Sequence, residues 1–213
     1  MSLLDIQNLT VTFPTPRGPV NVVDGVSLTL GQERLGIVGE SGSGKSTLFR
    51  AVAGLWPWGS GTILLPPREQ MMFLPQKPYL PLGTLRAALA YPSAPDAFAT
   101  EALCAVLERV HLAEFAPMLD REERWDRLLS MGEQQRLAFA RLLLQKPRWV
   151  FLDEATAALD DENQAQVMSI FDDELAGATV IHLRASAEDH FARVVAQGDT
   201  RPMANRKDAM QEL

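Results

Sequence analysis

The sequence predicts an α/β domain with a mostly parallel core sheet, and three observations support this prediction. An apolar run, 35–38, leads into the glycine-rich stretch 39–46 and then into the apolar segment 47–53, as in a strand, turn and helix. A second apolar run, 149–152, ends in two carboxylates, as in a parallel strand buried on both faces. From residue 84 to about 130, apolar residues recur at helical spacing, which indicates an inserted helical subdomain.

The N-terminal part is predicted to be an antiparallel β-subdomain. Residues 4–13 alternate between apolar and polar, and the turn-rich segment 14–19 separates them from a second strand over 20–30. Two further short strands are expected at 62–65 and 71–74.

Helices are predicted at 132–145 and 161–175, a buried strand at 179–183 and a final hairpin near 193–199. We expect a single domain over residues 1–213. Its core and β-subdomain would be formed by 1–83 and 131–213, and its helical subdomain by 84–130.

Composition restricts the possible partners and compartment. The net charge of −7 and the lack of a dense Lys/Arg run give no support for nucleic-acid binding. A single cysteine, Cys104, excludes an internal disulfide and suits a reducing compartment. No stretch approaches the roughly 20 apolar residues that span a bilayer, and the N-terminus lacks a signal-peptide pattern. We therefore expect a soluble chain that reaches a membrane only through a partner or a fused segment.

The stretch 39–46 matches the phosphate-loop pattern G-x-x-x-x-G-K-[ST] at every defined position, which predicts a P-loop NTPase. Glycines let backbone N–H groups approach phosphates, and the helix N-terminus adds partial positive charge. Lys45 would reach the β- and γ-phosphates, and the Ser46 hydroxyl would ligate Mg²⁺. The candidate nucleotide-contacting residues here are Gly39, Glu40, Ser41, Gly42, Ser43, Gly44, Lys45, Ser46 and Thr47.

The carboxylates Asp153 and Glu154 follow the apolar run 149–152. Ligands bind at the carboxyl ends of strands in α/β sheets, so Asp153 is expected to hold Mg²⁺ through water or through Ser46. Glu154 would polarise the attacking water as a general base. Taken without the phosphate loop, the pair also fits a solvated strand end.

The segment Leu129–Arg136 resembles the signature of the ATP-binding cassette (ABC) family, which reads L-S-G-G-Q followed by Q-R. Ser130 and Gly132 match this pattern, whereas Met131 and Glu133 depart from its commonest form. The resemblance implies that this helix start contacts the γ-phosphate held by a second domain. Ser130 and Glu133 also fit a capping box, and both roles are compatible.

Three further matches extend the resemblance over nearly the whole chain. Gln76 occupies the place of the Q-loop glutamine, which senses Mg²⁺ and water. Residues 157–160 match the D-loop at the dimer interface, although Asp160 equally fits a helix N-cap. Phe13 matches the aromatic residue that stacks on adenine, and a buried strand phenylalanine is the alternative.

Segments 53–61, 73–86 and 132–141 resemble one branch, the fatty-acyl and peroxisomal-type transporters with their bacterial relatives of the peptide-antibiotic-uptake type. Members of this branch usually carry a membrane domain N-terminal to the ATPase. Whether this chain is a stand-alone subunit or an excised domain stays open.

The family pattern fails at one position. It expects a histidine that contacts the γ-phosphate after the strand at 179–181, and Ala185 occupies that place. We favour loss of the residue. The alternatives are that His182 or His190 substitutes for it, or that the alignment of this short strand is shifted.

The resemblance implies an ATP-binding and ATP-hydrolysing domain that powers a membrane transporter. Its catalytic residues would be Lys45, Gln76 and Glu154, and its Mg²⁺ ligands Ser46, Gln76 and Asp153. The implied partners are ATP, a transmembrane subunit or fused membrane domain at the inner, cytoplasmic face of the membrane, and a second copy in a head-to-tail dimer. Ser130, Gly132 and Glu133 would contact the nucleotide across that dimer.

Two alternatives remain. One is a module that binds ATP with weak or no hydrolysis. The other is a soluble ABC ATPase of DNA repair or translation, which co-purification with a membrane subunit or with ribosomes would distinguish. The short gap between the phosphate loop and the signature lacks sustained heptads and argues against the repair type.

Overall fold

The computed structural model describes residues 4–31, 34–40 and 42–185. They form two compact units, each described here by itself. The strand unit contains residues 4–30, 35–65 and 182–185. The helical unit contains residues 66–181 with Gly31 and Arg34. The predicted division into subdomains at residues 83/84 and 130/131 stays a prediction.

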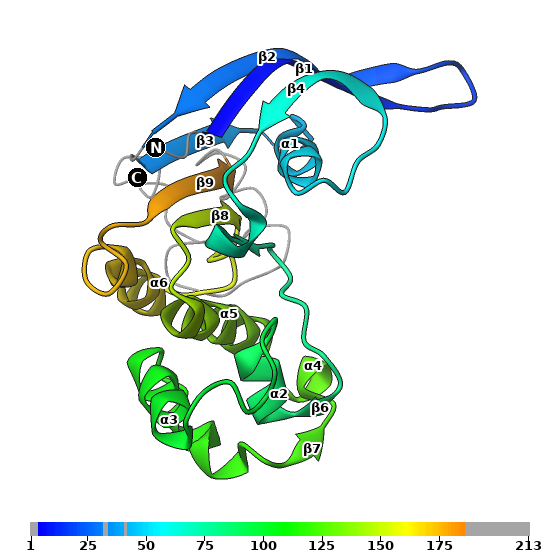
Figure 1. The fold of residues 1–213 in the computed structure, drawn as a ribbon. Helices are drawn as coiled ribbons and strands as arrows, with labels where there is room; N and C mark the ends of the chain where they lie inside the picture. Colours follow the sequence, from blue (N-terminus) through cyan, green and yellow to red (C-terminus); the bar gives the residue numbers. More distant parts are fainter. Residues whose placement is uncertain (1–3, 32–33, 41, 186–213) are drawn as a thin grey trace, which may run out of the picture. The chain divides into compact units, whose positions relative to one another are not determined.

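The strand unit contains the predicted antiparallel sheet, in the order β2-β1-β4 (Figure 1). Strands β1 (Leu4–Phe13) and β2 (Val20–Leu30) confirm the two N-terminal strands. Strand β4 (Gly59–Leu64) begins three residues before its predicted start. Gly61 explains this extension, because a Cβ there would lie 2.7 Å from the carbonyl oxygen of Asn8 on β1, and only glycine allows the two strands to pair so closely.

The same unit holds the strand–turn–helix predicted around the phosphate loop. Strand β3 (Arg34–Gly39, from residue 35 within this unit) leads into the loop, and α1 (Lys45–Val52) follows it. Helix α1 contacts β1 and β2, and its side chains Phe49 and Val52 are buried. This packing holds the helix start, and therefore the loop, against the antiparallel sheet.

In the helical unit, β5 (Met71–Leu74), β8 (Trp149–Asp153) and β9 (Thr179–Ala185, to residue 181 within this unit) lie side by side with β8 in the middle. Strands β5 and β8 are parallel, with Met71 opposite Trp149 and Leu74 opposite Leu152. The apolar residues of β8 are buried, as predicted for a strand covered on both faces.

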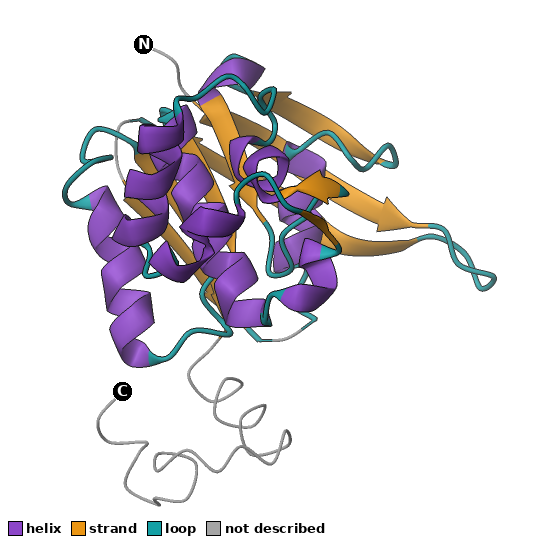
Figure 2. Ribbon diagram, turned by 90° about the horizontal axis from the view of Figure 1, so that it is seen from below, coloured by secondary structure: helices purple, strands orange, loops and turns teal. Residues whose placement is uncertain are grey.

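The helical unit also contains the predicted inserted helices (Figure 1, Figure 2). They are α2 (Leu85–Ala90), α3 (Thr100–Arg109) and α4 (Trp125–Leu128), with a 3₁₀ turn at Ala113–Met118. A short antiparallel pair, β6 (Gly83–Thr84) and β7 (Glu122–Glu123), closes this region. Outside the inserted region, α5 (Met131–Gln145) confirms the helix predicted over 132–145, and a further 3₁₀ turn lies at Arg68–Gln70. The shared core includes Leu89, Leu103, Leu107, Trp125, Phe139 and Leu142.

The helix predicted over 161–175 is too long. Helix α6 (Asp161–Met168) ends early and continues only as a 3₁₀ turn, Ser169–Phe171. Three carboxylates at 172–174 would face the negative end of a longer helix, which is unfavourable. In addition, Arg34 donates to the carbonyl of Phe171 and pairs with Asp172 at 2.9 Å, which holds the chain in a turn. The hairpin predicted near 193–199 lies outside the described residues.

Arg141 on α5 lies in the core of the helical unit, with 4% of its surface exposed. It donates to the carbonyl of Ala88 at 2.8 Å and to that of Tyr79 at 2.9 Å. Its guanidinium also lies over the ring of Tyr91. Burial lowers the pKa of Arg141 to about 10, yet it remains protonated at neutral pH. The cation therefore binds two chain segments to α5.

We predict that Arg141→Ala lowers the free energy of unfolding by about 3 kcal/mol, because two carbonyls lose a charged donor and a cavity forms. Urea denaturation measures this change. Arg148→Ala, at an exposed position, should change it by less than about 0.5 kcal/mol. Equal changes in the free energy of unfolding for the two substitutions would contradict a stabilising role of the Arg141 hydrogen bonds.

Candidate functional site: a phosphate loop and a carboxylate edge

The phosphate loop depends on glycines with left-handed backbone conformations. Gly42 and Gly44 have φ values of 85° and 86°. A Cβ on Gly44 would lie 2.6 Å from the carbonyl oxygen of Val22, so only glycine fits there. The Leu48 N–H donates to the Gly44 carbonyl at 2.8 Å, which starts α1 directly after the loop.

Lys45 closes the loop. Its Nζ donates to the carbonyl of Gly39, to that of Glu40 at 2.7 Å and to the Ser43 hydroxyl at 3.2 Å. A Cβ on Gly39 would lie 2.9 Å from Ser43 Oγ and 3.7 Å from the Lys45 Nζ, so the lysine end lies against the glycine.

The first turn of α1 holds no acidic residue. The helix N-terminus, the glycine turns and the ammonium therefore gather positive charge in one place, an arrangement that fits a phosphate group. Ser46 and Thr47 follow in the first turn, whereas Ser41 lies outside the described residues.

The predicted adenine-stacking residue Phe13 has an aromatic partner that the sequence analysis missed. Its ring lies 4.2 Å, centre to centre, from that of Trp56, whose indole N–H donates to the Thr12 carbonyl at 3.2 Å. Trp58 meets Trp56 edge-on at 5.3 Å. The segment Gly54–Trp58, with two tryptophans beside a proline, was the signal that could have suggested this cluster.

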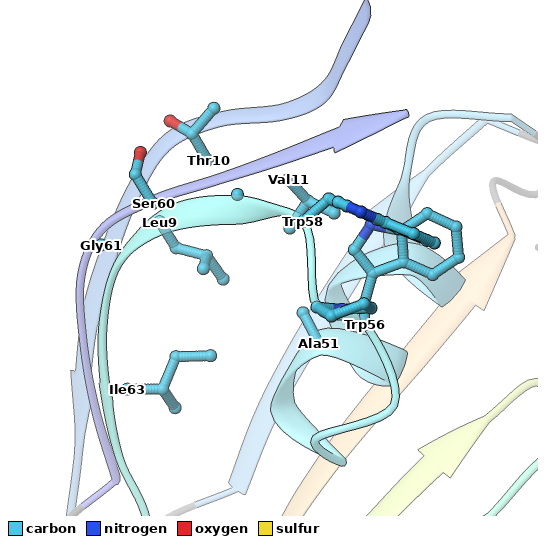
Figure 3. Close-up of a pocket in the computed structure, with 11 residues that line it drawn as sticks. Leu9, Thr10, Val11, Ala51, Trp56, Trp58, Ser60, Gly61 and Ile63 are labelled. Carbon is cyan, nitrogen blue, oxygen red and sulfur yellow. The ribbon is translucent and has the colours of Figure 1, made fainter. Parts of the chain in front are cut away.

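Trp56 also lines a pocket of about 160 Å³ between β1, β4 and α1 (Figure 3). In Figure 3, Leu9 and Ile63 extend into the space beside α1, whereas Thr10 and Ser60 point to the other side of the strands. Trp56 is therefore shared between this pocket and the Phe13 cluster.

The second half of the predicted site lies in the helical unit, where parallel strands end at the same edge. Gln76 follows β5, and Glu154 follows β8, which is the paired neighbour of β5. The Gln76 amide donates to Glu154 Oε2 at 3.3 Å. The structure therefore brings together two of the three predicted catalytic side chains.

Glu154 itself has a left-handed backbone, with φ 48°. This conformation is uncommon for a non-glycine residue and marks a local strain at the strand end. It turns the chain away from Asp153, the half-buried last residue of β8, into a loop where the Ala157 N–H donates to the Glu154 carbonyl at 3.1 Å.

The predicted helix N-cap at Asp160 and the predicted capping box of Ser130 and Glu133 are confirmed. The Asn163 N–H donates to Asp160 at 2.8 Å, so Asp160 caps α6. Ser130 accepts from the Glu133 N–H at 3.3 Å, while Glu133 accepts from the Ser130 N–H at 2.7 Å and from the Ser130 hydroxyl at 2.6 Å. This capping box positions the Ser130 hydroxyl at the start of α5. The D-loop and signature roles of these residues stay predictions.

The predicted site residues therefore form two groups. Phe13 and residues 39–47 lie in the strand unit, and Gln76, Ser130, Gly132, Glu133, Asp153 and Glu154 lie in the helical unit. Each group is organised within its own unit. The predicted Mg²⁺ ligands Ser46, Gln76 and Asp153 supply hydroxyl, amide and carboxylate oxygens, which are the donor types that Mg²⁺ prefers. Because they come from both groups, their assembly stays a prediction.

Comparison with known proteins identifies the family of this chain. Residues 23–157 match the family model described as ABC transporter. Over 176 residues, or 82% of this chain, the sequence is 43% identical to an uncharacterised ABC transporter ATP-binding protein of Haemophilus influenzae. The chain belongs to the ABC transporter family.

Two further similarities support the branch and the fold. The chain is 37% identical, over 76% of its length, to ABC transporter D family member 2, chloroplastic, of Arabidopsis thaliana. A solved structure of a bacterial Atm1-family ABC exporter with ATP bound superposes with a TM-score of 0.73, at 25% identity over 88% of this chain. The predicted family and P-loop α/β fold are thus confirmed.

The chain corresponds to only part of these proteins. It spans 29% of the Haemophilus protein and 30% of the Arabidopsis protein, and 35% of the exporter chain. Within residues 4–31, 34–40 and 42–185, no helix has both the length and the apolar character to cross a bilayer.

His182, one of the two histidines considered as a substitute at Ala185, is buried in β9. Only 8% of its surface is exposed, and its Nδ1 accepts from the Arg184 guanidinium at 3.1 Å. Burial, together with the charge of Arg184, lowers the pKa of His182 to about 4. His182 is therefore neutral at pH 7. His190 lies outside the described residues.

We predict that His182 makes stability depend on pH. Its pKa is about 4 in the fold and about 6.5 in an unfolded chain. The unfolded state therefore binds more protons between these values. The free energy of unfolding should be unaffected by this group above about pH 6.5 and should fall as pH decreases toward about 4. Urea denaturation at several pH values measures this, and His182→Gln should flatten the curve.

His111→Gln, at an exposed position, is the matched control and should leave the slope unchanged. An NMR titration that shows His182 protonating near pH 6.5 would contradict its burial.

Proposed function

We propose that this chain binds and hydrolyses ATP as the nucleotide-binding domain of a membrane transporter. The observation that carries the proposal is the loop 39–47, with its left-handed glycines, its enclosed Lys45 and the start of α1. Backbone N–H groups and Lys45 would hold the β- and γ-phosphates. Phe13, with Trp56 behind it, offers an aromatic face for the adenine.

Ser46, Gln76 and Asp153 would hold Mg²⁺, which neutralises charge on the phosphates during transfer. The Gln76 amide and the Glu154 carboxylate, already 3.3 Å apart, would orient the attacking water. Glu154 would accept a proton from that water as it attacks. These groups act by positioning and electrostatics, which suits phosphoryl transfer.

The signature residues Ser130, Gly132 and Glu133 are proposed to complete the site of a second copy in a head-to-tail dimer. The Ser130 hydroxyl and the Gly132 backbone N–H would donate to the γ-phosphate, and the dipole of α5 would stabilise its negative charge. The Ser130 hydroxyl now donates to Glu133, so it would exchange that bond for the phosphate when the dimer closes. Closure favoured by ATP and opening favoured by its products would move the membrane segments.

An exposed apolar surface on the helical unit is the proposed contact with the membrane partner at the cytoplasmic face of the membrane. Tyr79, Leu82 and Tyr91 are 62%, 70% and 40% exposed. The two tyrosine rings meet edge-on at 5.3 Å, which makes a preformed platform. Tyr79 lies shortly after Gln76 in the chain. A partner that binds this surface would therefore affect the position of Gln76. The membrane domain is the favoured occupant because the relatives are much longer than this chain.

We predict that Lys45→Met weakens ATP binding at least tenfold, since the phosphates lose their cation. Glu154→Gln should bind ATP normally and lower turnover by about a hundredfold or more. Nucleotide titration and steady-state phosphate release measure these effects. Arg50→Met, which removes an exposed cation from the same helix, is the control and should resemble wild type.

The Ala185 position motivates a second candidate, an ATP-binding module with little turnover. If wild type and Glu154→Gln are equally inactive while both bind ATP, the hydrolysis proposal is wrong and this second function holds. An increase in turnover in Ala185→His would support loss of the family histidine.

We predict that Leu82→Asp prevents co-purification with a separately expressed membrane partner of this chain, because a carboxylate would be buried in the contact. Basal turnover of the purified domain should not change. Leu55→Asp, at 69% exposure in the strand unit, is the matched control and should co-purify as wild type does. Normal co-purification of Leu82→Asp would exclude this surface.

A further inference from the structure

Gln135 is a buried amide on α5 that connects two loops of the candidate site. Its side chain is 1% exposed. The Nε2 donates to the carbonyl of Gln76 at 2.8 Å, and the Oε1 accepts from the Ala158 N–H at 3.0 Å. One side chain therefore pairs with the backbone of the loop after β5 and with the backbone of the loop after β8.

These two loops carry the Gln76–Glu154 pair. The Gln76 side chain donates to Glu154, and the Glu154 carbonyl accepts from the Ala157 N–H, the neighbour of Ala158. These contacts therefore form a closed ring. It runs from Gln135 to Gln76, on to Glu154, and through the following loop to Ala158, which pairs with Gln135 again. A shift of either loop would change the distance between the two proposed catalytic side chains.

The start of α5 touches the same peptide. A Cβ on Gly132 would lie 3.2 Å from the carbonyl oxygen of Ala158, so the helix start packs closely on this loop. Gln135, one turn further along α5, holds the Ala158 N–H. Helix α5 thus contacts the loop residue at both of its backbone polar groups, and Ser130 caps the same helix.

Glutamine is suited to this position because it carries a donor and an acceptor on one planar amide. Methionine has a similar volume and neither function. Ionised glutamate keeps the acceptor for Ala158 and loses the donor for Gln76.

We propose that Gln135 is a positioning residue that transmits the position of the α5 start to the Gln76–Glu154 pair and to the loop at Ala158. The proposal rests on the proposed ATP hydrolysis for its kinetic consequence. A displacement of the α5 start would thus move Gln76 and Glu154 through the Gln135 side-chain amide.

The kinetic test is Gln135→Met in the purified full-length protein. Turnover should fall about tenfold, with the KM for ATP within about twofold of wild type, because phosphate binding by Lys45 is untouched. The matched control is Gln145→Met on the same helix. The Gln145 amide also donates to a carbonyl, that of Ala90 at 2.8 Å, and accepts from the Ser93 hydroxyl at 3.1 Å. Its turnover should stay within about twofold of wild type.

A double-mutant cycle with Gln76→Ala tests the route of the effect. If Gln135 acts in part through the Gln76 side chain, Gln135→Met should lower turnover clearly less in the Gln76→Ala background than in wild type, with the remaining effect carried by the Ala158 contact. Independent effects that multiply would overturn the proposal, because they would place Gln135 outside the path to Gln76.

Amide hydrogen exchange, followed by NMR, tests the contact without turnover. Exchange at Ala158 should be faster in Gln135→Met and unchanged in Gln135→Glu, which keeps the acceptor. Gln135→Glu should also lose turnover at a pH at which the buried carboxyl is ionised, because a carboxylate cannot donate to the Gln76 carbonyl. It is the variant to use if Gln135→Met does not fold.

Unchanged exchange at Ala158 in Gln135→Met overturns the inference. If wild type itself shows no turnover while exchange at Ala158 responds as described, the proposed hydrolysis fails and the positioning contact stands.

Discussion

The helical unit depends on side chains of α5 that donate hydrogen bonds to backbone carbonyls of other segments. Their targets lie in the loop after β5, in α2, in the turn after α3 and in the segment before α5. The donors are Gln134, Gln135, Arg136, Arg141 and Gln145. Backbone carbonyls in loops and at helix ends need hydrogen-bond donors when they are buried, because leaving them unpaired would be costly. Helix α5 therefore supplies hydrogen-bond donors to the irregular segments around it and holds these segments in place.

The edge that carries Gln76 and Glu154 follows from the parallel pairing of β5 and β8. Because both strands run the same way, their carboxyl ends deliver Gln76 and Glu154 to the same edge. The left-handed backbone at Glu154 then redirects the chain toward α6, which Asp160 caps. Strain at one residue and a cap at another together shape the loop that Gln135 contacts.

Much of this arrangement was predictable from local patterns. The phosphate loop, the strands β1, β2, β5 and β8, and helix α5 coincide with their expected segments because glycine spacing and apolar periodicity act locally. The end of α6 was only partly predictable: the carboxylates at 172–174 are a local signal, but Arg34, which donates to the Phe171 carbonyl, is distant in sequence. The contact between Phe13 and Trp56 was missed for the same reason, because β1 and the segment after α1 meet only in the fold.

By itself, the sequence determined that a glycine-rich turn with a lysine opens a helix, and that two carboxylates end a buried strand. Residue type and spacing suffice for these features, since both arise within one turn or one strand. Only the tertiary structure decided that Gln135 faces both Gln76 and Ala158, and that His182 is buried and neutral. Hydrogen-bond partners and burial depend on which distant segments pack together, and a linear pattern does not contain that information.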